Sequence, residues 1–195
     1  WRCVASCSAA GALGNGPSGA VQLPGTGTRA VFESQATNLL ATSDANGSLS
    51  DIYMADLATG AVALVSQAPD GSPANGASSG AWASDDGQTI AFSSLATNLI
   101  PGTAAAKNGT IRQAYLRVGN PFGQSVRYLY LSKNLATNAL GNGDSINLRM
   151  TPDGRVGVFE SLASNLVEGD TNGVADIFRF ELNEAKTAVV RLDRV

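Results

Sequence analysis

The segment Phe32-Glu-Ser-Gln-Ala-Thr-Asn-Leu39 decides the fold, because the chain repeats it twice. It recurs as Phe92-Ser-Ser-Leu-Ala-Thr-Asn-Leu99 and as Phe159-Glu-Ser-Leu-Ala-Ser-Asn-Leu166, at offsets of 60 and 67 residues. The Asn-Gly pairs that begin at residues 15, 75 and 142 keep the same two offsets. Self-similarity at a fixed period of this size indicates an array of similar supersecondary units.

Each unit contains four short segments with the character of β-strands. In the first unit they are Ser18–Leu23, Thr28–Ser34, Asp51–Leu57 and Ala61–Ser66, separated by turn residues. The third of these segments alternates apolar and polar residues, as a half-buried strand does. An isolated four-stranded sheet would leave one apolar face in water, so such sheets stack around an axis. The repeat therefore predicts an all-β fold of β-propeller blades, each a four-stranded antiparallel sheet.

We expect one partial propeller domain over residues 1–195, with repeat units at approximately 4–64, 65–130 and 131–195. A β-sandwich would also show short strands and turns. It gives no reason for a repeat at fixed spacing, so the propeller is the better interpretation.

Two stretches resemble the repeats of TolB-like β-propellers. Thr151-Pro-Asp-Gly-Arg-Val-Gly-Val-Phe159 and Ser84-Asp-Asp-Gly-Gln-Thr-Ile-Ala-Phe92 are similar to the Ser-Pro-Asp-Gly-x-x-Ile-Ala-Phe signature of that family. Asp51-Ile-Tyr53 and Asp176-Ile-Phe178 resemble the strand that follows it, whereas the first unit departs with Pro24-Gly-Thr-Gly27 in place of the Asp-Gly turn. The resemblance implies a propeller fold. Such propellers serve as protein-interaction platforms, accessory domains of peptidases and surface-protein modules, so the fold does not select the function.

The number of units predicts an incomplete ring. Three units fall below the roughly four to eight blades that close a propeller. In addition, Trp1–Ser6 aligns with Val62–Gln67, so the chain opens on what looks like the last strand of another blade. We expect further sequence or a partner subunit to supply the remaining blades. Two copies of the chain would give a closed ring of six.

The composition excludes several classes of partner. The net charge is -3 and charged residues make up only 15% of the chain, which argues against nucleic acid because a phosphate-binding face needs clustered Lys and Arg. No run of some 18 apolar residues predicts a membrane span. Cys3 and Cys7 are the only cysteines and the chain has no His, so a disulfide is an open alternative and a zinc site is not indicated. Low charge and many small polar residues favour an extracytoplasmic location: periplasmic, cell-surface or secreted.

Two loops combine oxygen ligands with a glycine in a pattern that suits calcium. They are Asp44-Ala-Asn46-Gly-Ser-Leu-Ser-Asp51 and Asp170-Thr-Asn172-Gly-Val-Ala-Asp176. Carboxylate and amide oxygens are the ligands that calcium prefers, and the glycine permits a sharp turn. The alternative is a plain Asn-Gly turn in which the side chains bond the backbone. The expected metal ligands are Asp170, Asn172, Asp176, Asp44, Asn46 and Asp51.

No catalytic motif emerges, and we therefore expect a non-catalytic module. Without histidine, a serine nucleophile would need a lysine or another base, and the three lysines lie near no nucleophile motif. The repeated Asn38, Asn98 and Asn165 are interpreted as turn-fixing residues rather than ligand contacts. Tyr128 and Tyr130 share one face of an outer strand and suggest an alternative, a carbohydrate-binding propeller. The preferred function is protein–protein interaction or structural assembly, and a third alternative is the accessory propeller of a larger secreted hydrolase.

Overall fold

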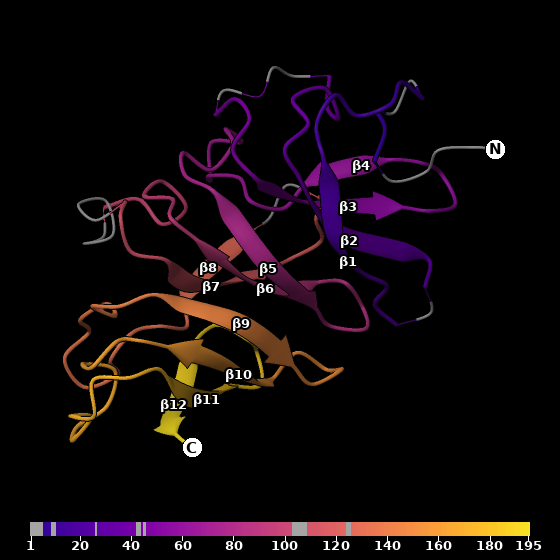
Figure 1. Cartoon of the computed structure of the whole chain (residues 1–195). Coiled ribbons are helices and arrows are strands. Elements are labelled where there is room, and N and C mark those ends of the chain that lie inside the picture. Colours follow the sequence, from indigo (N-terminus) through magenta and orange to yellow (C-terminus); the bar gives the residue numbers. More distant parts are fainter. Residues whose placement is uncertain are drawn as a thin grey trace.

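The computed structural model describes residues 6–8, 11–25, 27–41, 44, 46–102, 109–123 and 126–195. Within these ranges the protein consists of twelve strands in three four-stranded antiparallel sheets, without a helix (Figure 1). The prediction of an all-β fold made of three repeated sheets is therefore confirmed. The described part of the chain accordingly has no helix that is long and apolar enough to cross a membrane.

The strands follow chain order from one edge of each sheet to the other, so every sheet is an up-and-down meander. The first sheet contains β1 (Ser18–Gln22), β2 (Arg29–Ser34), β3 (Asp51–Asp56) and β4 (Val62–Leu64). The second contains β5 (Ser78–Ala83), β6 (Thr89–Ser94), β7 (Gln113–Val118) and β8 (Arg127–Tyr130). The third contains β9 (Ser145–Met150), β10 (Val156–Ser161), β11 (Asp176–Leu182) and β12 (Val189–Arg194).

A cross-strand aromatic pair joins the second and third strands of every sheet. In the first sheet Phe32 lies opposite Tyr53, and the two ring centroids are 5.7 Å apart. The equivalent pairs are Phe92 with Tyr115 and Phe159 with Phe178. Aromatic pairs of this kind stabilise a sheet by up to about 1 kcal/mol each. The phenylalanine that opens the repeated segment is therefore a core residue.

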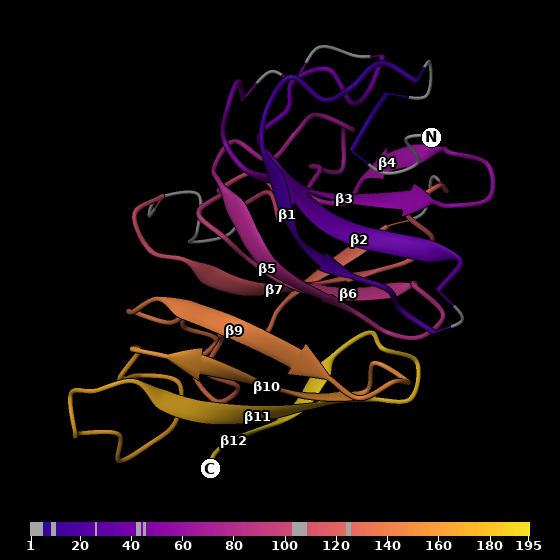
Figure 2. The same cartoon turned by 45° about the vertical axis from the view of Figure 1, so that its right-hand side comes forward.

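The sheets stack in chain order, with the second sheet between the first and the third (Figures 1 and 2). One apolar core lies between the first and second sheets, and another lies between the second and third. The first strand of each following sheet provides much of the contact: β5 packs against β1, β2 and β3, and β9 packs against β5, β6 and β7.

The repeat gives every sheet two distinct faces. We call the side toward the next sheet the trailing face and the side toward the preceding sheet the leading face. Val31 and its equivalent Ala91 lie on trailing faces, Phe32 and Phe92 on leading faces, and all four are buried. In the described part of the chain, the leading face of the first sheet and the trailing face of the third have no neighbouring sheet. The three sheets thus form an open stack, as in a partial propeller.

The asparagine of the repeated segment fixes the connector ahead of its sheet. Asn38 Oδ1 accepts a hydrogen bond from the N–H of Asn15 at 2.9 Å, and Asn38 Nδ2 donates to the carbonyl of Leu13 at 2.9 Å. The other two repeats form the same bonds through Asn98 and Asn165. These residues are structural, as the sequence predicted, but each holds backbone some 23 residues upstream rather than its own turn.

The connector ahead of the first sheet resembles the two connectors between sheets. Cys7 forms an isolated β-bridge with Leu13, and equivalent bridges join Gln67 to Pro73 and Lys133 to Leu140. Cys7 is also buried and disulfide-bonded. Cys3 lies outside the described residues, as does all but the last residue of the opening strand expected at 1–6.

The first strand of every sheet contains an irregularity that the sequence analysis did not predict. Ala20, Gly80 and Asn147 occupy the same position, and their φ angles are +47°, +67° and +56°. The pairing with the second strand shifts register at each of these points. A bulge of this kind kinks the strand.

Candidate functional site

The two loops predicted to bind calcium precede the third strand of the first and third sheets. Asp44, Asn46 and Asp51 belong to the β2–β3 connection, and Asp170, Asn172 and Asp176 belong to the β10–β11 connection. The last aspartate of each loop is also the first residue of β3 or β11, so a strand of the sheet holds it in place. The two sets of side chains find different partners.

Asp51 anchors the first loop. Its carboxylate is fully buried and accepts hydrogen bonds from Ser66 Oγ at 2.7 Å and from Asn46 Nδ2 at 2.8 Å. Burial raises the pKa of Asp51 to about 6 against the opposing effect of these hydrogen bonds, and the charge of Asp44 adds to the rise. The surroundings of Asp51 thus disfavour a negative charge that nothing compensates.

Two shielded oxygens of the same loop have no hydrogen-bond partner. Asp44 Oδ1 accepts the N–H of Asn46 at 3.2 Å, but Asp44 Oδ2 and Asn46 Oδ1 are buried and unpartnered. Burial also raises the pKa of Asp44. Because buried polar atoms nearly always have a partner, these oxygens suit a ligand that the protein chain itself does not supply.

The donor set of this loop fits a calcium ion. Calcium takes carboxylate and amide oxygens, and a cation beside Asp51 would favour its charged form. In the described part of the chain no three acidic, histidine or cysteine side chains gather at one point. The loop would therefore supply two carboxylates, from Asp44 and Asp51, with the amide oxygen of Asn46, and backbone oxygens or water would complete the shell.

In the third sheet an arginine occupies the place expected for the cation. Arg194 Nη1 lies 3.0 Å from Asp170 Oδ1 and 3.6 Å from Asp176 Oδ2. Asn172 Nδ2 donates to both carboxylate oxygens of Asp176, at 3.1 and 2.9 Å. Because the Asp170 side chain is only 3% exposed, its contact with the guanidinium is a shielded, charge-assisted bond. Calcium at this loop stays a prediction, and it would have to displace Arg194.

The first sheet has no counterpart of Arg194. A backbone hydrogen bond of 2.9 Å from Val195 to β11 matches one of 2.8 Å from Val65 to β3. This match aligns Arg194 with Leu64, whose side chain carries no charge. Among the described residues, no cation pairs with the Asp44 loop as Arg194 pairs with the Asp170 loop. The sequence did not reveal this difference, because the arginine lies on another strand, far from the loop in the chain.

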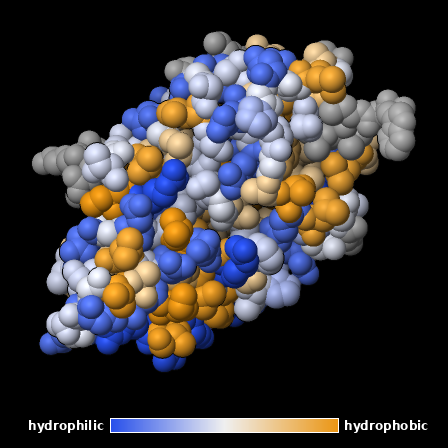
Figure 3. Space-filling view, in the orientation of Figure 1, coloured by the Kyte–Doolittle hydropathy of each residue, from blue (hydrophilic) through white to orange (hydrophobic). Residues whose placement is uncertain are grey.

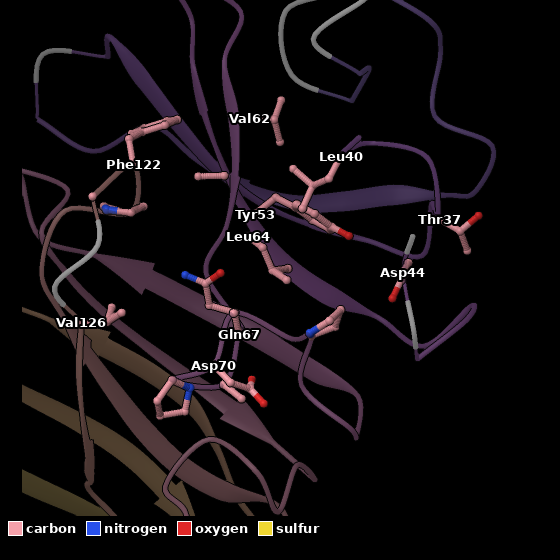
Figure 4. A pocket seen from close by; sticks show the side chains of 17 residues that line it. Thr37, Leu40, Asp44, Tyr53, Val62, Leu64, Gln67, Asp70, Phe122 and Val126 are labelled. Atoms are coloured by element: carbon pink, nitrogen blue, oxygen red, sulfur yellow. The ribbon is translucent and has the colours of Figure 1, made fainter. Parts of the chain in front are cut away.

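A pocket of about 480 Å³ adjoins the first sheet beside this loop (Figure 4). Asp44, Thr37 and Tyr53 lie on one side of it, and Phe122 and Val126 of the β7–β8 connection lie on the other. Burial and the nearby acidic side chains raise the pKa of the Tyr53 hydroxyl, which therefore remains a proton donor. Two different repeats provide the walls, so no single motif in the sequence pointed to this pocket.

The trailing face of the third sheet exposes apolar side chains at positions that the second sheet buries. Val158 is 36% exposed and Ile177 is 45% exposed. Their equivalents Ala91 and Ala114 are fully buried in the core against the third sheet. Apolar side chains gather on the surface in the lower part of the molecule, where the third sheet lies (Figure 3). The face has the character of a sheet–sheet contact but remains open.

The outer half of this trailing face is charged. Arg179 of β11 forms ion pairs with Glu181 at 3.1 Å and with Asp193 at 3.7 Å. The equivalents of Arg179 in the other sheets, Met54 and Leu116, are fully buried apolar residues. The ion pairs are about one-third exposed, so this half of the face favours water. The exposed apolar residues adjoin it: Val158 of β10 pairs opposite Arg179, and Ile177 precedes Arg179 by two positions on β11.

The two tyrosines considered for sugar binding are core residues, which corrects the expectation that they are exposed. Tyr130 is 8% exposed and its ring packs at a tilt against Tyr115, with ring centroids 4.9 Å apart. Tyr128 is partly buried, and its hydroxyl donates to the carbonyl of Val65 in the first sheet at 2.7 Å. Both rings fill the space between the first and second sheets. The carbohydrate-binding alternative thereby loses the residues that suggested it.

No family model matches the chain, and no curated protein matches it. Among solved structures, the tricorn protease is similar over 85% of this chain and 14% of its own, with 14% identity and a TM-score of 0.46. An acylaminoacyl peptidase of Pyrococcus horikoshii is similar over 89% of this chain and 24% of its own, with 12% identity and a TM-score of 0.47. The chain thus spans less than a quarter of either protein. The three sheets themselves carry the assignment to the β-propeller class, and the resemblance to TolB-like repeats stays a prediction.

Proposed function

We propose that the chain is a non-catalytic β-propeller module that acts outside the cytoplasm by binding another protein, in recognition or in structural assembly. The open trailing face of the third sheet is the observation that carries this proposal. Val158 and Ile177 are exposed there, although the equivalent positions of the second sheet are fully buried. Apolar patches on soluble proteins commonly mark interaction surfaces.

The disulfide at Cys7 supports the extracytoplasmic part of the proposal. Disulfides form and persist in oxidising compartments and are rare in the reducing cytosol. The low content of charged residues, 15%, is in keeping with a secreted or periplasmic protein.

We further propose that the Asp44 loop holds a calcium ion that stabilises the first sheet. The support comes from two buried oxygens without a partner and from the raised pKa of Asp51. In this role calcium is a structural ligand: it neutralises carboxylates and fixes the loop that leads into β3.

Photo-crosslinking at the open face tests the interaction function. A photoreactive phenylalanine analogue replaces Ile177 in one variant and Glu184 in a control variant, since Glu184 is exposed in the β11–β12 turn. Each variant is irradiated alone and with the extracytoplasmic fraction of the source cells. We expect a protein adduct at position 177 and none at position 184. If position 177 forms no adduct either when the variant is irradiated alone or when the extracytoplasmic fraction is present, the proposal is overturned.

Adducts with the extracytoplasmic fraction also decide between the remaining alternatives. A crosslinked hydrolase would assign the chain to the accessory-propeller class. A crosslinked non-enzymatic protein would favour the structural or recognition role.

A further inference from the structure

We infer that the trailing face of the third sheet binds β1 of a second copy of this chain, head to tail. The inference rests on the proposed function and names the partner. Within one chain the same contact already occurs twice, where β5 packs on the first sheet and β9 packs on the second. The same contact would form a third time if the third sheet bound β1 of another copy.

β1 exposes side chains at the positions that β5 and β9 bury. Val21 is 67% exposed and Leu23 is 59% exposed. Their equivalents are Ala81 and Ala83 at β5, and Leu148 and Met150 at β9, none more than 8% exposed. β1 therefore has the apolar pattern of a first strand, and in the described part of the chain no preceding sheet covers it.

A polar contact of the existing interfaces has equivalent residues on the two open surfaces. Glu33 on the first sheet accepts a hydrogen bond from the N–H of Gly80 on β5 at 2.6 Å. At the equivalent position of the second sheet, Ser93 Oγ bonds the backbone of β9 at 2.8 Å. The third sheet has Glu160 there, partly exposed, and its Oε2 accepts a hydrogen bond from Asn147 Nδ2 at 2.9 Å. The equivalent target of the Glu160 carboxylate is the N–H of Ala20 in β1 of the second copy.

A second polar position bonds the following sheet in both contacts within the chain. Gln22 bonds both backbone groups of Ala83, with distances of 2.7 and 3.1 Å. Its equivalent Trp82 donates from Nε1 to the carbonyl of Met150 at 3.2 Å. In the third sheet the position belongs to Arg149, whose guanidinium already lies over the Trp82 ring, 4.6 Å from its centroid, and donates to the carbonyl of Leu148.

The open apolar positions of both surfaces lie beside covered or charged parts. On the leading side of the first sheet, Phe32 and Tyr53 are already buried at 3% exposure, whereas Val21 of β1 is exposed. On the trailing side of the third sheet, the ion pairs of Arg179 occupy the outer half and favour water. Val158 of β10 and Ile177 of β11 are thus the apolar positions that the strand would cover, as β5 covers their equivalents Val31 and Ile52 on the first sheet.

Head-to-tail contact between two copies gives a ring of six sheets. This number lies within the roughly four to eight that close a propeller. Twofold symmetry would repeat the contact at both junctions, and twofold dimers are the commonest oligomers.

Sedimentation velocity on the whole chain tests the inference. We expect a species of twice the monomer mass. Ile177→Lys and Leu23→Lys change exposed residues on the two opposite surfaces, and each is expected to weaken self-association by about tenfold or more. The matched control is Leu135→Lys, which adds the same charge at an exposed leucine of the connector between the second and third sheets and should change nothing.

The outcomes separate this inference from the proposed function. In the crosslinking experiment, irradiation of the chain alone should link position 177 to the peptide that contains residues 18–23. If the chain stays monomeric at every concentration, the inference that a second copy binds this face is overturned. A dimer that Leu23→Lys leaves intact overturns it as well. In either case, an adduct between position 177 and an extracytoplasmic protein would still uphold the interaction function. Circular dichroism of each variant checks that the sheets remain folded.

Discussion

At the scale of single residues, Asp51 shows how one buried carboxylate ties stability to pH. The pKa of Asp51 rises from 3.8 to about 6 because burial disfavours the charged form. The folded chain therefore holds this proton more tightly than the unfolded chain does. The stability that Asp51 contributes is fully present below about pH 4 and is lost as the pH rises through about 6.

We predict that, without calcium, wild-type protein loses up to about 3 kcal/mol of unfolding free energy between pH 4 and pH 7.5 relative to Asp51→Asn. Calcium should restore stability at pH 7.5, where Asp51 is charged, and have little effect at pH 4.5, because ligand binding to the folded state stabilises by mass action. Thermal unfolding at several pH values, with calcium or with a chelator, measures both effects.

Asp176→Asn provides the control, because it changes the equivalent residue of the third sheet, where Arg194 already faces the carboxylate. This variant should keep the calcium response of the wild type. Asp44→Asn should abolish it. A calcium response that survives Asp44→Asn but disappears in Asp176→Asn would place the ion in the other loop.

At the scale of the element, the bulge in the first strand predicts opposite changes in stability for substitutions at two equivalent residues. Ala20 has φ +47° and Gly80 has φ +67°, in the left-handed region that costs an L-residue about 1–2 kcal/mol. Ala20→Gly should therefore stabilise the chain by about 1 kcal/mol, and Gly80→Ala should destabilise it by a similar amount. A Cβ at Gly80 would meet no atom within 4 Å, so the effect reports on the backbone alone.

Chemical denaturation of both variants measures these two changes. If both substitutions shifted stability in the same direction, the left-handed conformation at this position would not be the cause.

The strands were predictable from sequence because their signals are local. The Phe of each repeated segment pairs across β2–β3 or its equivalent, and the turns between strands carry their own Gly and Asn residues. The bulge at Ala20 was not predictable, since alanine gives no sign of a positive φ. The six calcium candidates could be named from a motif, but the ion pair between Asp170 and Arg194 joins segments 24 residues apart. Only the folded sheet brings them together.

At the scale of the whole molecule, the described middle sheet has a neighbouring sheet on both sides and each described outer sheet on one. All six residues of β6 are buried, and so are five of the six in β7. In β1 four of the five residues are exposed, and in β12 none is buried. Stability in an array of stacked sheets follows contacts between neighbours, so the ends of this array should open before its centre.

Amide hydrogen exchange under native conditions should therefore rank the strands by their place in the stack. We expect the slowest exchange in β6 and β7, whose opening requires global unfolding, and the fastest in β1 and β12, which open locally. Mass spectrometry of peptides from each sheet measures this order. If head-to-tail dimers form at high concentration, exchange in β1 and at the β9–β10 side of the third sheet should slow, while β6 stays unchanged. Equal protection of all twelve strands at low concentration would show instead that the sheets unfold as one cooperative unit, and that the open faces do not weaken the ends of the stack.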